Sequence, residues 1–219
     1  MTAPNIARLH ISLPGTNPLI WRRVDVALSV TLQDLHDVIQ AVLPWEDCHL
    51  FQFEIGDAIH GLPDPEAGAD ADLNDVAATR LESIVAAGVV KFTYIYDLGD
   101  DWRHDVAIES LAHAVPKVKY PHYIDGAHRA PPEDVGGAPG FARFLKTIAK
   151  GSKAARGELF DWYGGEYDPG EIDRDEIEDN LADLARPVTA GKRGRSKNIR
   201  GKNDVREKAC LPVRSRRLA

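Results

Sequence analysis

The strongest constraint on the fold is an alternation of side chains between residues 92 and 109, which an acidic turn interrupts. Aromatic residues at positions 92, 94 and 96 alternate with Thr93 and Ile95, a period of two that is typical of a strand covered on both faces. The sequence DLGDD at 97–101 supplies a glycine and several carboxylates, as hairpin turns do. Residues 102–109 then predict a second strand. One of its faces carries Trp102, His104, Val106 and Ile108.

The tip of this predicted hairpin has three interpretations. Asp97, Asp100 and Asp101 could hold a divalent cation together with His104. Alternatively, His104, or His49 on a neighbouring strand, could act as a general base that an aspartate orients. In the third interpretation the tip is a solvated acidic turn whose aspartates bond the backbone, with Trp102 in the core.

The remaining elements place this hairpin in an α+β fold. Strands are predicted at 6–13, 20–28 and 49–55, with a helix that begins after Thr31 and ends at Pro44. A short helix is predicted at 81–85, and longer helices after Pro139 and Asp173. Segments 56–75 and 116–139 are rich in turn residues and predict loops. Two strands, a helix and further strands indicate a β-grasp-like core, followed by C-terminal helices.

Two polar residues are predicted to lie against the core. Arg22 shares the mostly apolar face of its strand with Ile20 and Val24, so an ion pair with a carboxylate is expected, because an unpaired buried guanidinium is costly. His36 borders the apolar stripe of the first helix and is interpreted as a packed histidine.

Charge divides the chain of 219 residues into two parts. Residues 1–190 carry 16 Lys and Arg against 32 Asp and Glu, whereas residues 191–219 carry 11 against 2. We therefore predict one acidic α+β domain over 1–187 and a basic, disordered tail over 188–219. The acidic domain is a poor match for nucleic acid, whereas residues 191–219 could make nonspecific nucleic-acid contacts.

The sequence also favours a cytoplasmic location. It has no apolar run long enough for a membrane span and no signal-peptide core at the N-terminus. The two cysteines, Cys48 and Cys210, suggest neither a disulfide framework nor a zinc-binding pattern.

Five stretches, in order along the chain, resemble the plasmid pRiA4b ORF-3-like family, also described as insertion-element passenger or "TnpR-like" proteins. They are PLIWRRV at 18–24, LHDVIQ at 35–40, WEDCHLFQFE at 45–54, YDLGDDWRH at 96–104 and PPEDVGG at 131–137. The resemblance covers residues 6–186 and implies an α+β domain from plasmids and mobile elements whose activity is not established. Recombinase or resolvase activity is not expected, because no serine or tyrosine nucleophile with an arginine cluster is visible.

One departure from the family pattern concerns cysteines. Relatives carry cysteines around the PPED segment, where this chain has Tyr123, Ala130 and Val135. A thiolate–metal site therefore cannot be transferred from the family. Glu133 and Asp134 before Gly136 and Gly137 are interpreted as a polar loop with a structural role.

These observations lead to three functional hypotheses. The first is a non-enzymatic accessory or protein-interaction domain with an unknown protein partner, because no set of nucleophile, base and orienting residue is recognisable. The second is a metal-dependent hydrolase or nuclease-like enzyme that uses the hairpin from Asp97 to His104. The third is nucleic-acid binding through the basic tail. The sequence suggests no cofactor other than a divalent cation.

Overall fold

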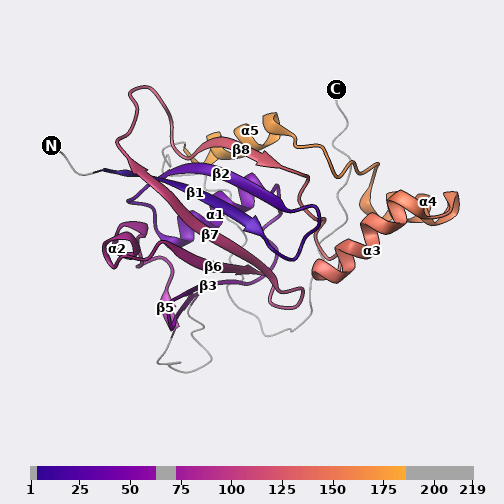
Figure 1. The fold of residues 1–219 in the computed structure, drawn as a ribbon, viewed down its shortest axis with the longest axis horizontal. Coiled ribbons are helices and arrows are strands. Elements are labelled where there is room, and N and C mark those ends of the chain that lie inside the picture. Colours follow the sequence, from indigo (N-terminus) through magenta and orange to yellow (C-terminus); the bar gives the residue numbers. More distant parts are fainter. Residues whose placement is uncertain (1–3, 63–72, 186–219) are drawn as a thin grey trace, which may run out of the picture.

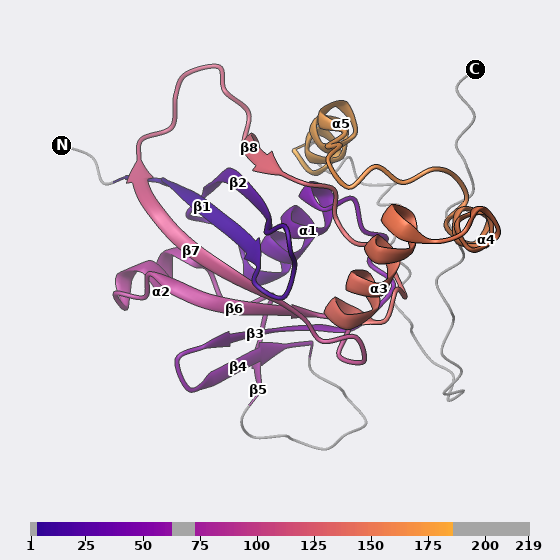
Figure 2. The same cartoon turned by 45° about the vertical axis from the view of Figure 1, so that its right-hand side comes forward.

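The computed structural model describes residues 4–62 and 73–185 and shows a mixed α+β fold built on one sheet. The strands are β1 (Ile6–Leu13), β2 (Ile20–Ala27), β3 (Phe51–Ile55), β4 (Ala58–Gly61), β5 (Leu73–Asp75), β6 (Lys91–Tyr96), β7 (Trp102–Ala112) and β8 (His122–Ala127). The helices are α1 (Leu32–Val42), α2 (Leu81–Ala86), α3 (Gly137–Lys150), α4 (Lys153–Tyr163) and α5 (Arg174–Leu184). The strand order is β5-β4-β3-β6-β7-β1-β2-β8, and neighbours are antiparallel except β4 and β5 (Figures 1 and 2).

The predicted central hairpin is confirmed as β6 and β7. The two strands pair in register from Tyr96 opposite Trp102. Asp97 and Asp101 both have positive φ, 54° and 51°, and the Asp101 amide donates to the Asp97 carbonyl at 2.7 Å. Aspartate tolerates this left-handed conformation better than most residues with a Cβ atom. The acidic sequence therefore makes the tight turn possible.

Helix α1 covers one face of the sheet, and its start is also confirmed. The Thr31 side chain accepts from the Asp34 amide and the Asp34 side chain accepts from the Thr31 amide, which is a capping box. Buried residues of α1, including Leu35 and Ile39, pack against the sheet. Helix α5 contacts α1 and β8, and Figure 1 shows α1 behind the sheet.

The opposite face of the central strands is polar. Arg8 pairs with Asp25 at 2.7 Å, and Arg23 pairs with Glu109 at 2.6 Å. Along β2 the side chains alternate between buried and partly exposed, as expected of a strand with one covered face. The core therefore lies between the sheet and α1.

Arg22 differs from its prediction. Its side chain is only 1% exposed, and no carboxylate pairs with it among the described residues. Instead its Nε donates to the Val42 carbonyl at 2.8 Å, and its Nη1 donates to the carbonyls of Trp21 and Ala127 at 2.8 and 3.1 Å. The guanidinium thus joins the C-terminal end of α1 to β2 and β8.

Some elements depart from their predicted bounds. Strand β3 begins at Phe51 instead of residue 49, β4, β5 and β8 lie in segments predicted to be loops, and α4 lies where no element is predicted. Strands β4 and β5 have four and three residues, β5 is exposed, and β8 contains Gly126 and one buried side chain, Tyr123, so they lack the alternation that identifies a strand. The α+β class is confirmed, and the β-grasp comparison stays a prediction.

The basic tail at 188–219 lies outside the described residues, and the single-domain boundary at 187 stays a prediction. Within residues 4–62 and 73–185, none of the helices combines the length and apolar character that crossing a membrane requires.

Candidate functional site

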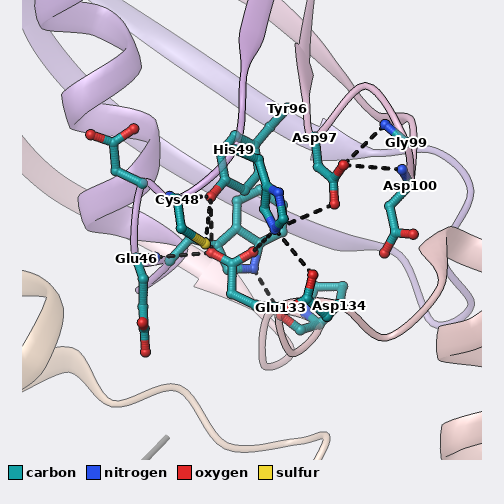
Figure 3. Close-up of polar contacts among 12 residues, drawn as sticks. Glu46, Cys48, His49, Tyr96, Asp97, Gly99, Asp100, Glu133 and Asp134 are labelled. Atoms are coloured by element: carbon teal, nitrogen blue, oxygen red, sulfur yellow. Dashed lines mark hydrogen bonds and ion pairs between the residues drawn. The ribbon is translucent and has the colours of Figure 1, made fainter. Parts of the chain in front are cut away.

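Side chains from three separate segments meet at the end of the sheet beside the β6–β7 turn. His49 precedes β3, Asp97 follows β6, and Glu133 and Asp134 lie in the loop between β8 and α3. His49 Nε2 lies 3.5 Å from Asp97 Oδ2, 3.2 Å from Asp134 Oδ1 and 3.9 Å from Glu133 Oε2 (Figure 3). We call these four residues the His49 cluster.

Three hydrogen bonds hold the segment before β3 in place. Trp45 Nε1 donates to the Pro131 carbonyl at 2.8 Å, and the Glu46 amide donates to Glu133 Oε1 at 2.9 Å. The Cys48 amide donates to the Tyr96 hydroxyl at 3.0 Å. These bonds tie the WEDCH stretch to the PPED loop and to β6, so His49 faces both.

The PPEDVGG loop is fixed from the other side by the hairpin. The Gly136 amide donates to Asp100 Oδ2 at 3.0 Å. Gly137 has φ +62°, and a Cβ atom there would lie 2.4 Å from the Asp100 carbonyl oxygen, closer than real Cβ contacts. Glycine is therefore required at 137 so that the loop can approach the hairpin.

Burial changes the acidity of Glu133. Loss of solvent raises the pKa of Glu133 to about 7, although hydrogen bonds from the Glu46 amide and the Tyr96 hydroxyl oppose this shift. Burial also raises the pKa of Tyr96, so the phenol stays protonated and donates to Glu133. The cluster therefore contains a carboxyl group whose charge depends on its immediate neighbours.

The spacing of the ligand atoms suits a small cation. One nitrogen of His49 and one oxygen each of Asp97 and Asp134 lie within 4.8 Å of one another. Two ligands about 2.1 Å from a tetrahedral cation lie about 3.4 Å apart. The distances of 3.5 and 3.2 Å from His49 to the two aspartates bracket that value.

Two further residues lie near the cluster. Cys48 Sγ lies 3.8 Å from the Tyr96 hydroxyl and, with one ligand atom each of His49 and Glu133, forms a second group within 4.8 Å. His36 is fully buried, as predicted for a packed histidine. It contacts the Tyr94 hydroxyl at 2.7 Å and Asp47 Oδ1 at 2.8 Å.

The structure brings two of the sequence candidates together and separates the others. His49 and Asp97 belong to the cluster, whereas the Asp100 carboxylate bonds Gly136. Asp101 is exposed and lies 3.4 Å from Arg103.

His104 is fully buried between Trp45 and Tyr94. Burial lowers the pKa of His104 to about 4. His104 is therefore a neutral core residue. It cannot coordinate a cation that is reachable from solvent at the hairpin tip.

Glu133 and Asp134 complete the cluster, although their sequence suggests only a polar loop. No local pattern reveals this role, because His49 and Asp134 are distant in sequence. One feature of the sequence does point to Glu133 and Asp134. The WEDCH, YDLGDD and PPED stretches are three of the five that carry the family resemblance. These three stretches meet at one place.

A cavity of about 140 Å³ adjoins the cluster. Trp45, Glu46 and Glu133 line it, together with Arg22, Arg129 and residues 171–173, 176 and 177. It is smaller than most ligand pockets, and its wall contains both apolar and charged groups. The His49 cluster thus has a small cavity on one side.

Two known proteins are similar to most of this chain. The chain is 32% identical over 182 residues to the uncharacterized protein y4hQ of Sinorhizobium fredii, which covers 83% of this chain and 93% of that protein. A crystal structure of a protein of unknown function, MM3350 from Methanosarcina mazei, is similar with a TM-score of 0.72 at 30% identity. That match covers 80% of this chain and 97% of the other.

The family model for plasmid pRiA4b ORF-3-like proteins matches residues 5–176. This match includes all five stretches and every residue of the His49 cluster. The chain therefore belongs to the plasmid pRiA4b ORF-3-like family.

Proposed function

We propose that this protein binds a divalent cation at the His49 cluster and uses the cation for hydrolysis. The observation that carries the proposal is the meeting of one imidazole nitrogen and two carboxylates from three segments within 4.8 Å. His49 and Asp97 are 20% and 12% exposed at their side chains, so the cluster is shielded but reachable from solvent. The hydrolase hypothesis is thereby favoured over the non-enzymatic one.

The ligand types indicate which cations to test. Imidazole suits Zn²⁺ and other late transition metals, whereas carboxylates also suit Mn²⁺ and Mg²⁺. A set of one histidine and two or three carboxylates therefore favours Zn²⁺ or Mn²⁺ over Mg²⁺. A cation bound in such a set lowers the pKa of a coordinated water and polarises an ester, amide or phosphoester oxygen.

A second function is favoured by a different observation. Leu50 and Leu98 are 66% and 50% exposed, and the Asp97 amide donates to the Leu50 carbonyl at 2.9 Å. Two exposed leucines therefore flank the cluster, where they could contact a protein partner. In that case the cation would stabilise the surface of an interaction domain instead of serving catalysis.

The first test is a titration of chelator-treated protein with Zn²⁺, Mn²⁺ and Mg²⁺, followed by calorimetry and thermal unfolding. One cation per chain is expected. At a free concentration of about 100 times Kd the cation adds about 2.7 kcal/mol to the free energy of unfolding. Hydrolysis is then measured with p-nitrophenyl esters and phosphoesters.

Asp97→Asn and Asp101→Asn are the matched pair for this test. The Asp97 Oδ1 accepts the Gly99 and Asp100 amides, and the asparagine oxygen can keep these bonds while one ligand charge is lost. A loss of at least about tenfold in cation affinity is expected. Asp101 lies in the same turn but outside the cluster, so its variant should bind normally.

Three results are informative. Equal cation binding by both variants, or no binding by the wild type, would disprove the proposed site. Binding without hydrolysis of any ester would leave a cation-stabilised interaction domain as the function. Binding with hydrolysis that Asp97→Asn removes would support the hydrolase.

A further inference from the structure

The cavity beside the His49 cluster contains a positive charge that the described residues leave without a carboxylate partner. Arg22 lines the cavity and is 1% exposed. Its Nε and Nη1 donate to three backbone carbonyls, whereas Nη2 has no hydrogen-bond partner among residues 4–62 and 73–185. A buried guanidinium is normally paired, because an uncompensated charge in the interior is costly.

Backbone carbonyls fix the orientation of this guanidinium before any ligand arrives. They hold it to the end of α1 and to β8, and burial lowers the pKa of Arg22 only to about 10. The group therefore stays charged at neutral pH. A preoriented guanidinium with a free nitrogen next to a cavity suits an oxyanion, and its fork fits a carboxylate.

The other charges around the cavity restrict the kind of anion. Glu46, Asp173 and Glu176 line it and are exposed. Arg129 lines it too, but Arg129 already pairs with Glu171 at 2.8 Å. This acidic rim repels polyanions and attracts cationic groups.

We infer that the cavity binds a small zwitterion, with its carboxylate on Arg22 and its ammonium group at the rim formed by Glu46, Asp173 and Glu176. A volume of about 140 Å³ holds about four or five waters at the density of the liquid. That space suits a unit of the size of an amino acid. This binding does not require a cation.

The position of the cavity also suggests a substrate class, and this step rests on the proposed function. Glu133 belongs both to the cavity wall and to the His49 cluster. A ligand held by its carboxylate at Arg22 would extend toward the cation. The substrate class is then a short peptide, whose free C-terminal carboxylate and N-terminal ammonium group leave an internal amide bond for hydrolysis.

The test is NMR of the full chain in the presence of a chelator, with observation of the Arg22 Nε–H signal. The probes are 4-aminobutanoate, butanoate, butylamine and inorganic phosphate. We expect saturable shifts of this signal with 4-aminobutanoate, affinity at least threefold weaker for butanoate, and no shift with butylamine. Ala130 also lines the cavity and takes no part in the hydrogen bonds of Arg22, so Ala130→Leu, which narrows the cavity, should abolish the shift.

These probes compare ligands on the unaltered protein, so the result does not depend on a variant that fails to fold. No Arg22 shift with either carboxylate would overturn the inference, as would equal binding of butylamine or tighter binding of phosphate. Because the chelator removes cations, failure here is distinct from failure of cation binding. Zwitterion binding in the cavity and cation binding at the His49 cluster can therefore be disproved independently.

Discussion

At the scale of single residues, two buried polar groups in the core carry the clearest energetic consequences. His104 and Arg22 are 0% and 1% exposed. They differ in charge, since His104 is neutral near pH 7 whereas Arg22 is protonated. The period-two pattern places each on the covered face of its strand. It does not predict that His104 Nε2 has no partner within residues 4–62 and 73–185, nor that carbonyls bind Arg22. Those contacts depend on elements that are distant in sequence.

The neutral state of His104 predicts a loss of stability in mild acid. In the unfolded chain histidine titrates near pH 6.5, whereas burial lowers the pKa of His104 to about 4. Between these values the unfolded state binds the extra proton, so the free energy of unfolding falls as pH falls, by at most about 3 kcal/mol. His104→Phe should reduce this slope in urea unfolding measured from pH 7 to pH 4.5. An unchanged slope would contradict the assignment.

Arg22 and its neighbour Arg23 form a matched pair for stability. Arg22→Leu removes the donor to the carbonyls of Val42 and Ala127, and we expect a loss of about 2–4 kcal/mol in the free energy of unfolding. Arg23→Leu breaks a partly exposed ion pair with Glu109 and should cost less than about 1 kcal/mol. Denaturant unfolding of both variants measures the difference. Similar losses would show that the buried carbonyl contacts contribute little.

At the scale of elements, local patterns identified the structure well where side chains are both periodic and capped. Strands β1 and β2, the start of α1, and the β6–β7 hairpin follow from alternation, a capping box and turn residues. Strand β8 and the PPEDVGG loop do not, because contacts with β2 and Asp100 define them. The same reason explains the incomplete site: His49 and Asp97 were candidates, whereas Glu133 and Asp134 join them only through tertiary packing.

The approach of the PPEDVGG loop to the hairpin can be tested with two glycines. Gly137→Ala places a Cβ atom 2.4 Å from the Asp100 carbonyl oxygen at positive φ, so we expect a loss of at least about 2 kcal/mol and weaker cation binding. Gly157→Ala lies in α4, where a Cβ atom meets nothing within 4 Å, and should stabilise the protein by about 0.5–1 kcal/mol. Thermal unfolding and cation titration of both variants measure these effects. Normal cation binding by Gly137→Ala would contradict the positioning role of the loop.

At the scale of the whole molecule, charge separates the acidic body from the basic end. Residues 191–219 hold 11 of the 27 Lys and Arg residues. In the described body the His49 cluster lies at one end of the sheet, beside the β6–β7 turn (Figure 3), and the cavity adjoins it. Residues 1–190 carry twice as many Asp and Glu as Lys and Arg, so their net charge is opposite in sign to that of the last 29 residues. We therefore propose that any attraction to nucleic acid comes from those residues.

The full chain and a chain of residues 1–190 should therefore differ in their binding of DNA. The full chain should bind double-stranded DNA weakly at low salt, and its affinity should fall steeply as salt rises, because counterions are released from the phosphates. A chain of residues 1–190, with 16 Lys and Arg against 32 Asp and Glu, should not bind. Fluorescence anisotropy at 50 and 200 mM salt measures both. Equal binding by the shorter chain would place the nucleic-acid contact on the body instead.

The order of the three cluster segments along the chain has a consequence for protein synthesis. His49 and Asp97 leave the ribosome well before Asp134, and strands β1 to β7 are complete at Ala112. A nascent chain that stops between these points contains most of the sheet but cannot form the cluster or the cavity. A gene interrupted after the hairpin would therefore encode a protein that folds in part yet binds neither cation nor zwitterion. Cation binding would then report whether translation has passed residue 134, whereas zwitterion binding would require the cavity residues up to Ile177 as well.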